Sequence, residues 1–199
     1  MNGKLWKFAI AGIVVAGALM LGMSPGNAAG KYETISGRMY GTSTQMGRNA
    51  GLEFTIYRFS TPEEREILVE AFKKGQSDGL ADALRKLKEA GRISITGTIG
   101  YEVSYIRVIP TETGRKIRFV TNRKIAFGEA RNNTQSKAYD LTAGEFDLND
   151  KEPKKSEGTL FPAAQLVINK NGELQWELNQ NPWRVSGITD WKPKTEEKQ

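Results

Sequence analysis

Residues 99–120 read IGYEVSYIRVIPTETGRKIRFV, two runs of β-branched and aromatic residues on either side of a short polar segment. In the first run, Tyr101, Val103 and Tyr105 alternate with polar residues, which is the two-residue period of a strand. The segment PTETG at 110–114 combines Pro and Gly and predicts a turn. We therefore expect an antiparallel hairpin, with Val103 and the two tyrosines on one face.

Similar signals recur along most of the chain. Turn residues separate runs with strand character about every ten residues. A clear hairpin joins 159–168 to 173–178 across the turn sequence NKNG. The other strand-like runs include 31–40, 52–59, 139–148 and 182–189. About eight strands predict a mainly β member of the α+β class, built as one antiparallel β-barrel or β-sandwich, and the pattern does not separate these two.

A helical segment interrupts the strand pattern after Thr61. The sequence TPEE provides an N-cap threonine, a proline at the first helical position and a glutamate placed to close a capping box. Apolar residues at helical spacing follow, and Gly75 is expected to end this helix. A second helix would begin at Ser77 or Asp78. We therefore expect an αα-hairpin over residues 62–90, inserted among the strands.

The first 29 residues predict a signal peptide. Two lysines precede an uncharged apolar run at 8–23, which is shorter than the roughly 20 residues that span a bilayer. Small residues then favour cleavage after Ala28 or Ala29. We expect an exported bacterial protein, periplasmic or secreted, without a stable membrane span after cleavage. An uncleaved membrane anchor is the alternative.

The remaining sequence predicts a single domain. Residues 30–191 are enough to bury a core of their own, and the polar segment 192–199 is expected to be a disordered tail. The signal segment holds two lysines and no acid, so its removal lowers the net charge from +6 to +4. This mild excess, without any block of basic residues, argues against a nucleic-acid partner.

The chain contains no cysteine and no histidine. Disulfides, zinc sites of the Cys/His type and His-dependent catalytic triads are therefore excluded. Paired carboxylates could still hydrolyse a glycan. The candidate acids include Glu129, Asp140, Glu145 and Asp147. We expect a protein without enzymatic activity, cofactor or metal, and keep a carboxylate-dependent glycan hydrolase as an alternative.

Two kinds of binding site are open. The stretch TNRKIAFGEARNN at 121–133 places several charged side chains around a small apolar group. A barrel of about eight strands could instead hold an apolar ligand among aromatic strand residues, with Val103 and Phe119 among its lining. The candidate binding residues are Arg123, Glu129, Arg131, Asn132, Tyr101, Tyr105 and Trp176.

The segments TNRKIAFGEARNN, TQSKAYDL and EGTLFPAAQL resemble parts of small bacterial proteins that carry a signal peptide and have no assigned function. The resemblance covers about residues 61–190, implies export, and carries over no activity and no site residue. From all of these patterns we expect an exported β-rich domain that binds an envelope component or an apolar small molecule. A structural or assembly partner of another envelope protein is a further alternative.

Overall fold

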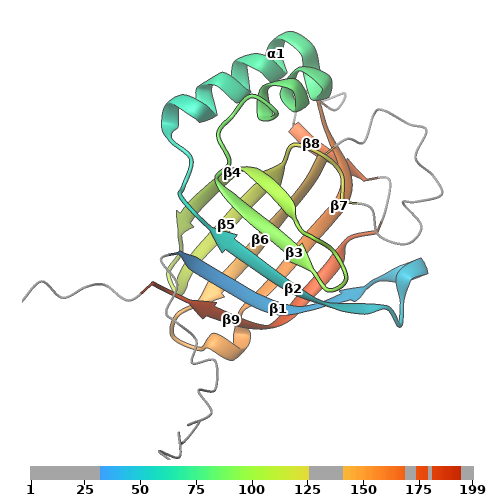
Figure 1. Ribbon diagram of the computed structural model, residues 1–199, viewed down its shortest axis with the longest axis vertical. Helices are drawn as coiled ribbons and strands as arrows, with labels where there is room; N and C mark the ends of the chain where they lie inside the picture. Colours follow the sequence, from blue (N-terminus) through green and yellow to red (C-terminus); the bar gives the residue numbers. More distant parts are fainter. Residues whose placement is uncertain (1–31, 126–140, 169–173, 179–180, 194–199) are drawn as a thin grey trace, which may run out of the picture.

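The structure, a computed structural model, describes residues 32–125, 141–168, 174–178 and 181–193. Its main element is one antiparallel sheet of nine strands, most of which form a barrel (Figure 1). The strands are β1 Glu33–Gly41, β2 Asn49–Ile56, β3 Gly91–Ile95, β4 Tyr101–Pro110, β5 Gly114–Thr121, β6 Leu141–Asn149, β7 Glu157–Ile168, β8 Leu174–Leu178 and β9 Trp183–Trp191. Two short 3₁₀ helices, Ser43–Gln45 and Pro153–Lys155, lie in the connections.

The strand order closes the barrel. Neighbours run β6-β5-β4-β3-β2-β1-β9-β7, and β6 also pairs with β7, which joins the two ends into a ring of eight strands. Strand β8 pairs with the second half of β7 and extends the sheet outside this ring. Most strands pair with their neighbour in sequence, and the two long connections are residues 57–90, which contain the helix, and residues 122–140. The expectation of a mainly β fold is confirmed, and of the two alternatives it is the barrel that forms.

The interior of the barrel is a packed core. The rings of Phe54, Phe119 and Phe146 are each at most 1% exposed and meet with centroids 4.5–5.5 Å apart. Gly144 pairs with Phe119 across the strands, and a Cβ at this glycine would collide with the phenyl ring. Val103 and Phe119, which the sequence suggests as pocket residues, both belong to this core.

Buried charges close one end of the interior. The Arg115 guanidinium donates hydrogen bonds to both carboxylate oxygens of Glu33, at 2.7 and 3.2 Å, and to Asp190 Oδ2 at 2.8 Å. All three side chains are less than one-fifth exposed. Burial raises the pKa of Glu33, while the neighbouring Arg115 acts in the opposite direction. The guanidinium thus compensates two carboxylates that the fold has taken out of water.

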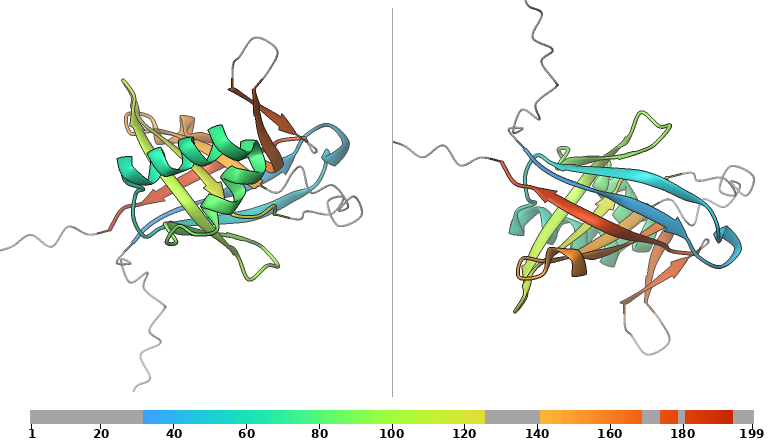
Figure 2. Two further views of the ribbon diagram at one scale, coloured as in Figure 1. Left: turned by 90° about the horizontal axis from the view of Figure 1, so that it is seen from above. Right: turned by 90° about the horizontal axis from the view of Figure 1, so that it is seen from below.

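A single helix, α1 (Pro62–Leu84), lies across the outside of the barrel (Figures 1 and 2). The capping box is confirmed, since the Thr61 hydroxyl accepts from Glu64 N–H and the Glu64 carboxylate accepts from Thr61 N–H. The expected αα-hairpin over 62–90 is not confirmed. Gln76 leaves the helical conformation with φ 52° and ψ −141°, next to the expected stop at Gly75, but helix resumes at once. The result is a kinked helix without a connecting loop.

Candidate functional site

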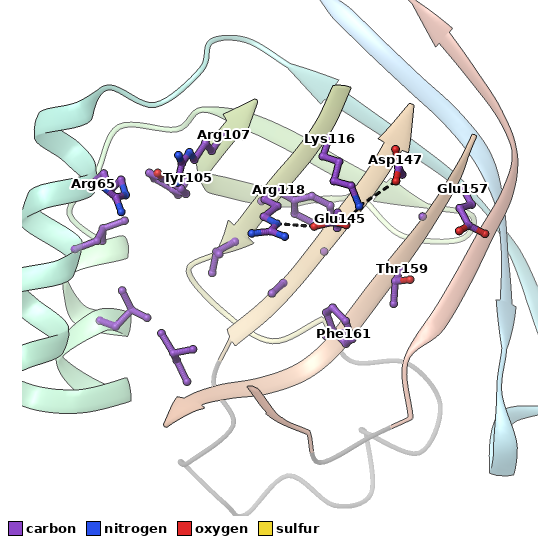
Figure 3. A pocket seen from close by; sticks show the side chains of 18 residues that line it. Arg65, Tyr105, Arg107, Lys116, Arg118, Glu145, Asp147, Glu157, Thr159 and Phe161 are labelled. Carbon is purple, nitrogen blue, oxygen red and sulfur yellow. Dashed lines mark hydrogen bonds and ion pairs between the residues drawn. The ribbon is translucent and has the colours of Figure 1, made fainter. Parts of the chain in front are cut away.

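A groove of about 620 Å³ runs between α1 and the outer surface of β4–β7 (Figure 3). Its floor includes the apolar side chains Leu68, Leu80, Val120, Ala143, Phe161 and Leu166. Its polar lining includes Arg65, Tyr105, Arg107, Lys116, Arg118, Glu145, Asp147, Glu157 and Thr159. An apolar floor with polar groups around it is the usual composition of a small-molecule site.

The apolar floor exists because α1 packs on the outside of the barrel. Outward strand positions normally carry polar residues, but here Val120, Leu141 and Leu166 contact a second hydrophobic cluster built from α1. The Ser60 hydroxyl, just before α1, accepts a hydrogen bond from Ile106 N–H at 3.0 Å. The Ser77 hydroxyl accepts from Leu166 N–H at 3.4 Å. These bonds tie both halves of the helical segment to the barrel wall.

Four charges neutralise one another on the wall of the groove. Lys116 Nζ lies 3.1 Å from Glu145 Oε1 and 3.0 Å from Asp147 Oδ2. Arg118 Nε donates to the other oxygen of Glu145. Burial raises the pKa of Glu145, but hydrogen bonds from Arg118 and Lys116 outweigh it, so that the pKa is lowered overall. The hydrogen bonds that Lys116 donates to Asp147 and Glu145 raise the pKa of its ammonium group. Both groups therefore stay charged near neutral pH.

This network bears on the glycan hydrolase alternative. Glu145 and Asp147 contact the same Lys116 ammonium, so their carboxylates are near neighbours inside a groove, as paired acids would need. A general acid, however, needs a raised pKa, and that of Glu145 is lowered by its cations. The other two candidate acids, Glu129 and Asp140, lie outside the described residues. The described pair is better suited to holding strands together than to donating a proton.

The end of the groove nearest α1 is basic. Arg65, near the start of α1, and Arg107, on β4, lie on either side of Tyr105 (Figure 3). Within the described part of the chain, neither guanidinium has an ion-pair partner. Burial raises the pKa of Tyr105, and the charges of Arg107 and Arg65 act against it. The phenol therefore remains a hydrogen-bond donor at neutral pH, between two guanidinium groups that have no ion-pair partner among the described residues.

Tyr105 reaches the groove because of an irregularity in β4. The sequence predicts Tyr101, Val103 and Tyr105 on one face, and this is wrong. The register with β5 shifts between Val103 and Tyr105, so that Val103 and Ile106 are both buried in the core and Tyr105 turns outward. A bulge of this kind adds one residue and re-aims every later side chain, and a simple alternation pattern does not reveal it.

The structure brings two of the expected site residues together outside the groove. The Arg123 guanidinium lies 5.6 Å from the centre of the Tyr101 ring, a cation–π contact. Just beyond, Ile125 is fully buried, and its N–H donates to Thr142 Oγ1 at 2.7 Å. The described start of the 121–133 stretch is thus anchored in the core.

The other expected residues are placed differently. Glu129, Arg131 and Asn132 lie outside the described residues. For Trp176, on β8, the structure describes the backbone, which pairs with Leu166 of β7. Sequence reasoning missed Arg65 and Arg107, because charged residues on strands and helices are usually solvated and nothing in the pattern says which strands α1 covers.

The described residues contain neither a candidate membrane-spanning helix nor a cluster of metal-ligating side chains. No helix among them is both long and apolar enough to cross a membrane. No group of three or more acidic, Cys or His side chains among them is arranged to hold a metal ion.

Comparison with known proteins adds no relative. No family model matches the chain, and neither the curated proteins nor the solved structures contain a significant match.

Proposed function

We propose that this protein is a non-enzymatic, exported binding protein that holds an apolar or amphipathic envelope molecule in the groove between α1 and β4–β7. The observation that carries the proposal is the groove itself. Its volume of about 620 Å³ falls in the usual range for ligand sites, and its apolar floor opens onto a wall that is otherwise charged.

The location outside the barrel follows from the packing inside it. The three contacting phenylalanines fill the interior, and the Arg115 ion pairs close one end of it. The outer groove remains open beside this core. On its wall Lys116 pairs with Glu145 and Asp147, so each of these three charges has a partner of opposite sign. A ligand can enter the groove without unfolding the core.

Export is the part of the proposal that rests on the first 29 residues, which lie outside the described part of the chain. It is tested by expressing the full chain in a bacterium and separating the cell fractions. We expect a product in the periplasm or medium whose mass corresponds to cleavage after Ala28 or Ala29. A full-length product retained in the membrane would support the uncleaved anchor instead.

The binding function is tested by native mass spectrometry of the exported product. We expect a retained small molecule of defined mass. The variant Thr159→Trp fills the groove from β7 and should lose this molecule. The matched control Thr55→Trp replaces an equally half-buried threonine on β2, away from the groove, and should keep it.

The outcomes separate the alternatives. An equal loss from both variants, or retention by both, would contradict binding in the groove. A co-purifying protein in place of a small molecule would favour the assembly-partner alternative. Release of sugar from a glycan by the wild type, abolished in Glu145→Gln, would establish the hydrolase.

A further inference from the structure

We infer that the groove selects amphiphiles with an anionic head group, a carboxylate or a phosphate, and binds this head group between Arg65, Tyr105 and Arg107. The inference rests on the proposed function and names the chemical class of its ligand. It depends on Arg65 and Arg107, which line the groove and have no ion-pair partner among the described residues.

The ion pairs along the groove fix where an anion can bind. Glu145 and Asp147 already take up Lys116 and Arg118, so these cations are satisfied within the protein. Arg65 and Arg107 have no ion-pair partner among the described residues, although both line the groove. An incoming anion would therefore meet two free guanidinium groups without having to displace an existing partner.

Nearby acids do not cancel this charge. Glu64, next to Arg65 in sequence, is held by Arg58 through two hydrogen bonds of 2.8 Å. Glu157 lines the opposite end of the groove, beyond the Lys116 network (Figure 3). The groove is thus polarised, basic next to α1 and acidic at its far end. An anionic head group is attracted to the first end and repelled from the second.

The donors suit an oxyanion. A guanidinium offers paired N–H donors that match a carboxylate or phosphate, and the phenol of Tyr105 adds one O–H donor between the two arginines. Burial raises the pKa of this phenol, which keeps its proton in place. Two cations and one neutral donor together recognise a singly or doubly charged head group.

The chain of the amphiphile has an apolar surface beside this end. Leu68 and Leu80 of α1 face Val120 and Leu166 of the barrel wall, and all four contribute to one hydrophobic cluster that borders the groove. Leu68 and Leu80 are already buried, but Val120, Phe161 and Leu166 are only half-buried, and an alkyl chain lying along them would cover apolar surface that water now contacts. A head group without a chain would bury none of this apolar surface. We therefore expect tight binding only when the anionic head group and the alkyl chain belong to one molecule.

The test is calorimetric titration of the signal-free protein with single-chain probes below their micelle concentrations. The probes are dodecanoate, dodecyl phosphate, dodecyl maltoside and dodecyltrimethylammonium, with acetate and inorganic phosphate as anions without a chain. We expect the two anionic amphiphiles to bind at least about tenfold more tightly than the other four.

Variants locate the head group. Arg65→Gln/Arg107→Gln should weaken dodecanoate about tenfold or more and leave dodecyl maltoside within about twofold. Arg65→Lys/Arg107→Lys keeps the charge and should retain part of the affinity. Arg38→Gln removes an exposed arginine of β1 that bonds only to Asn49 among the described residues, and should change nothing. Thermal unfolding of each variant verifies that it is folded.

Each result is decisive. Equal binding of neutral and anionic amphiphiles would overturn the anion selectivity and leave the groove as a binding site. Binding of inorganic phosphate as tight as that of dodecyl phosphate would overturn the role of the chain. An equal loss in Arg38→Gln would overturn the assignment to Arg65 and Arg107. If none of the amphiphiles binds, the proposed function fails together with this inference.

Discussion

The same strands, β4–β7, present two very different faces. Their inner face is closed, with Ile117, Phe119 and Phe146 each at most 1% exposed. Their outer face carries an apolar strip that α1 covers only in part, next to paired and unpaired charges. The inner face accounts for stability and the outer face has the features of a binding surface. If this division is correct, substitutions on the inner face should change stability and leave ligand affinity intact, and substitutions in the groove should mainly change ligand affinity.

The largest effect is expected inside. Phe54 is fully buried and contacts both Phe119 and Phe146, so Phe54→Ala leaves a cavity that the closed barrel cannot easily refill. We expect a loss of about 3–5 kcal/mol in the free energy of unfolding, measured by urea denaturation. At temperatures where the variant is still folded, its affinity for dodecanoate should be unchanged. A loss below about 1 kcal/mol would mean that the interior is loosely packed and could itself hold a ligand.

The next largest effect concerns the buried charges at the end of the barrel. Arg115→Gln leaves Glu33 and Asp190 as neighbouring carboxylates without their cation. We expect a loss of about 2–3 kcal/mol near pH 7, somewhat below the value for fully buried pairs because these side chains are 11–17% exposed.

This loss should depend on pH in a defined direction. Burial already raises the pKa of Glu33, and removing Arg115 raises it further, so the variant takes up protons more readily than the wild type as the pH falls. Once the Glu33 carboxyl is neutral, the missing cation matters less. Denaturation near pH 4 should therefore show a smaller difference between the two proteins than near pH 7. A constant difference would argue that Arg115 acts through packing alone.

Parts of this division could be predicted from the sequence. Alternation in segments such as 114–121 gives strands, and the TPEE sequence gives the start of α1 with its capping box. These features depend on neighbouring residues along the chain. The pairing of β1 with β9, without which the ring stays open, depends on residues far apart in sequence, such as the pair Thr34 and Trp191. Local patterns do not encode that pairing.

The site was harder to predict than the fold for the same reason. Arg107 is close to Tyr105 along β4, but Arg65 lies 40 positions earlier in the printed sequence and becomes a neighbour of Tyr105 only because α1 lies over β4. The bulge after Val103 also reverses the expected direction of Tyr105. The sequence predicts a binding site at 121–133 instead, because a cluster of charged residues along the chain can be recognised without knowing how the chain packs.

A smaller effect is expected on the outer face. Glu145→Gln removes the acid that pairs with Lys116 and Arg118, and should cost about 1 kcal/mol at neutral pH. The pKa of Glu145 is lowered on folding, so its contribution is complete above its unfolded pKa of about 4.3 and is lost as the pH falls through the folded value. Wild type and variant should converge in acid.

The variant Glu145→Gln also tests whether the outer face can change its affinity for a ligand without a change in the core. It leaves Arg118 and part of the Lys116 charge without a partner inside the groove, so the affinity for dodecanoate should rise a few-fold while the core is untouched. Calorimetric titration measures this change, with Phe54→Ala as the opposite case that alters stability alone. An unchanged affinity would mean that the anionic head group does not approach the Lys116 network.

The smallest effect is expected at Arg123, which the sequence marks as a binding residue. Its guanidinium contacts the Tyr101 ring, but it does not line the groove. An exposed cation–π contact contributes little, so Arg123→Gln should change the free energy of unfolding by no more than about 0.5–1 kcal/mol. The affinity for dodecanoate should stay within about twofold of the wild type, whereas Arg107→Gln, within the groove, should weaken it. If Arg123→Gln weakened binding as much as Arg107→Gln, the ligand would extend beyond the groove toward the stretch at 121–133. The outer face would then contain one larger site, with the charge cluster visible in the sequence as a part of it.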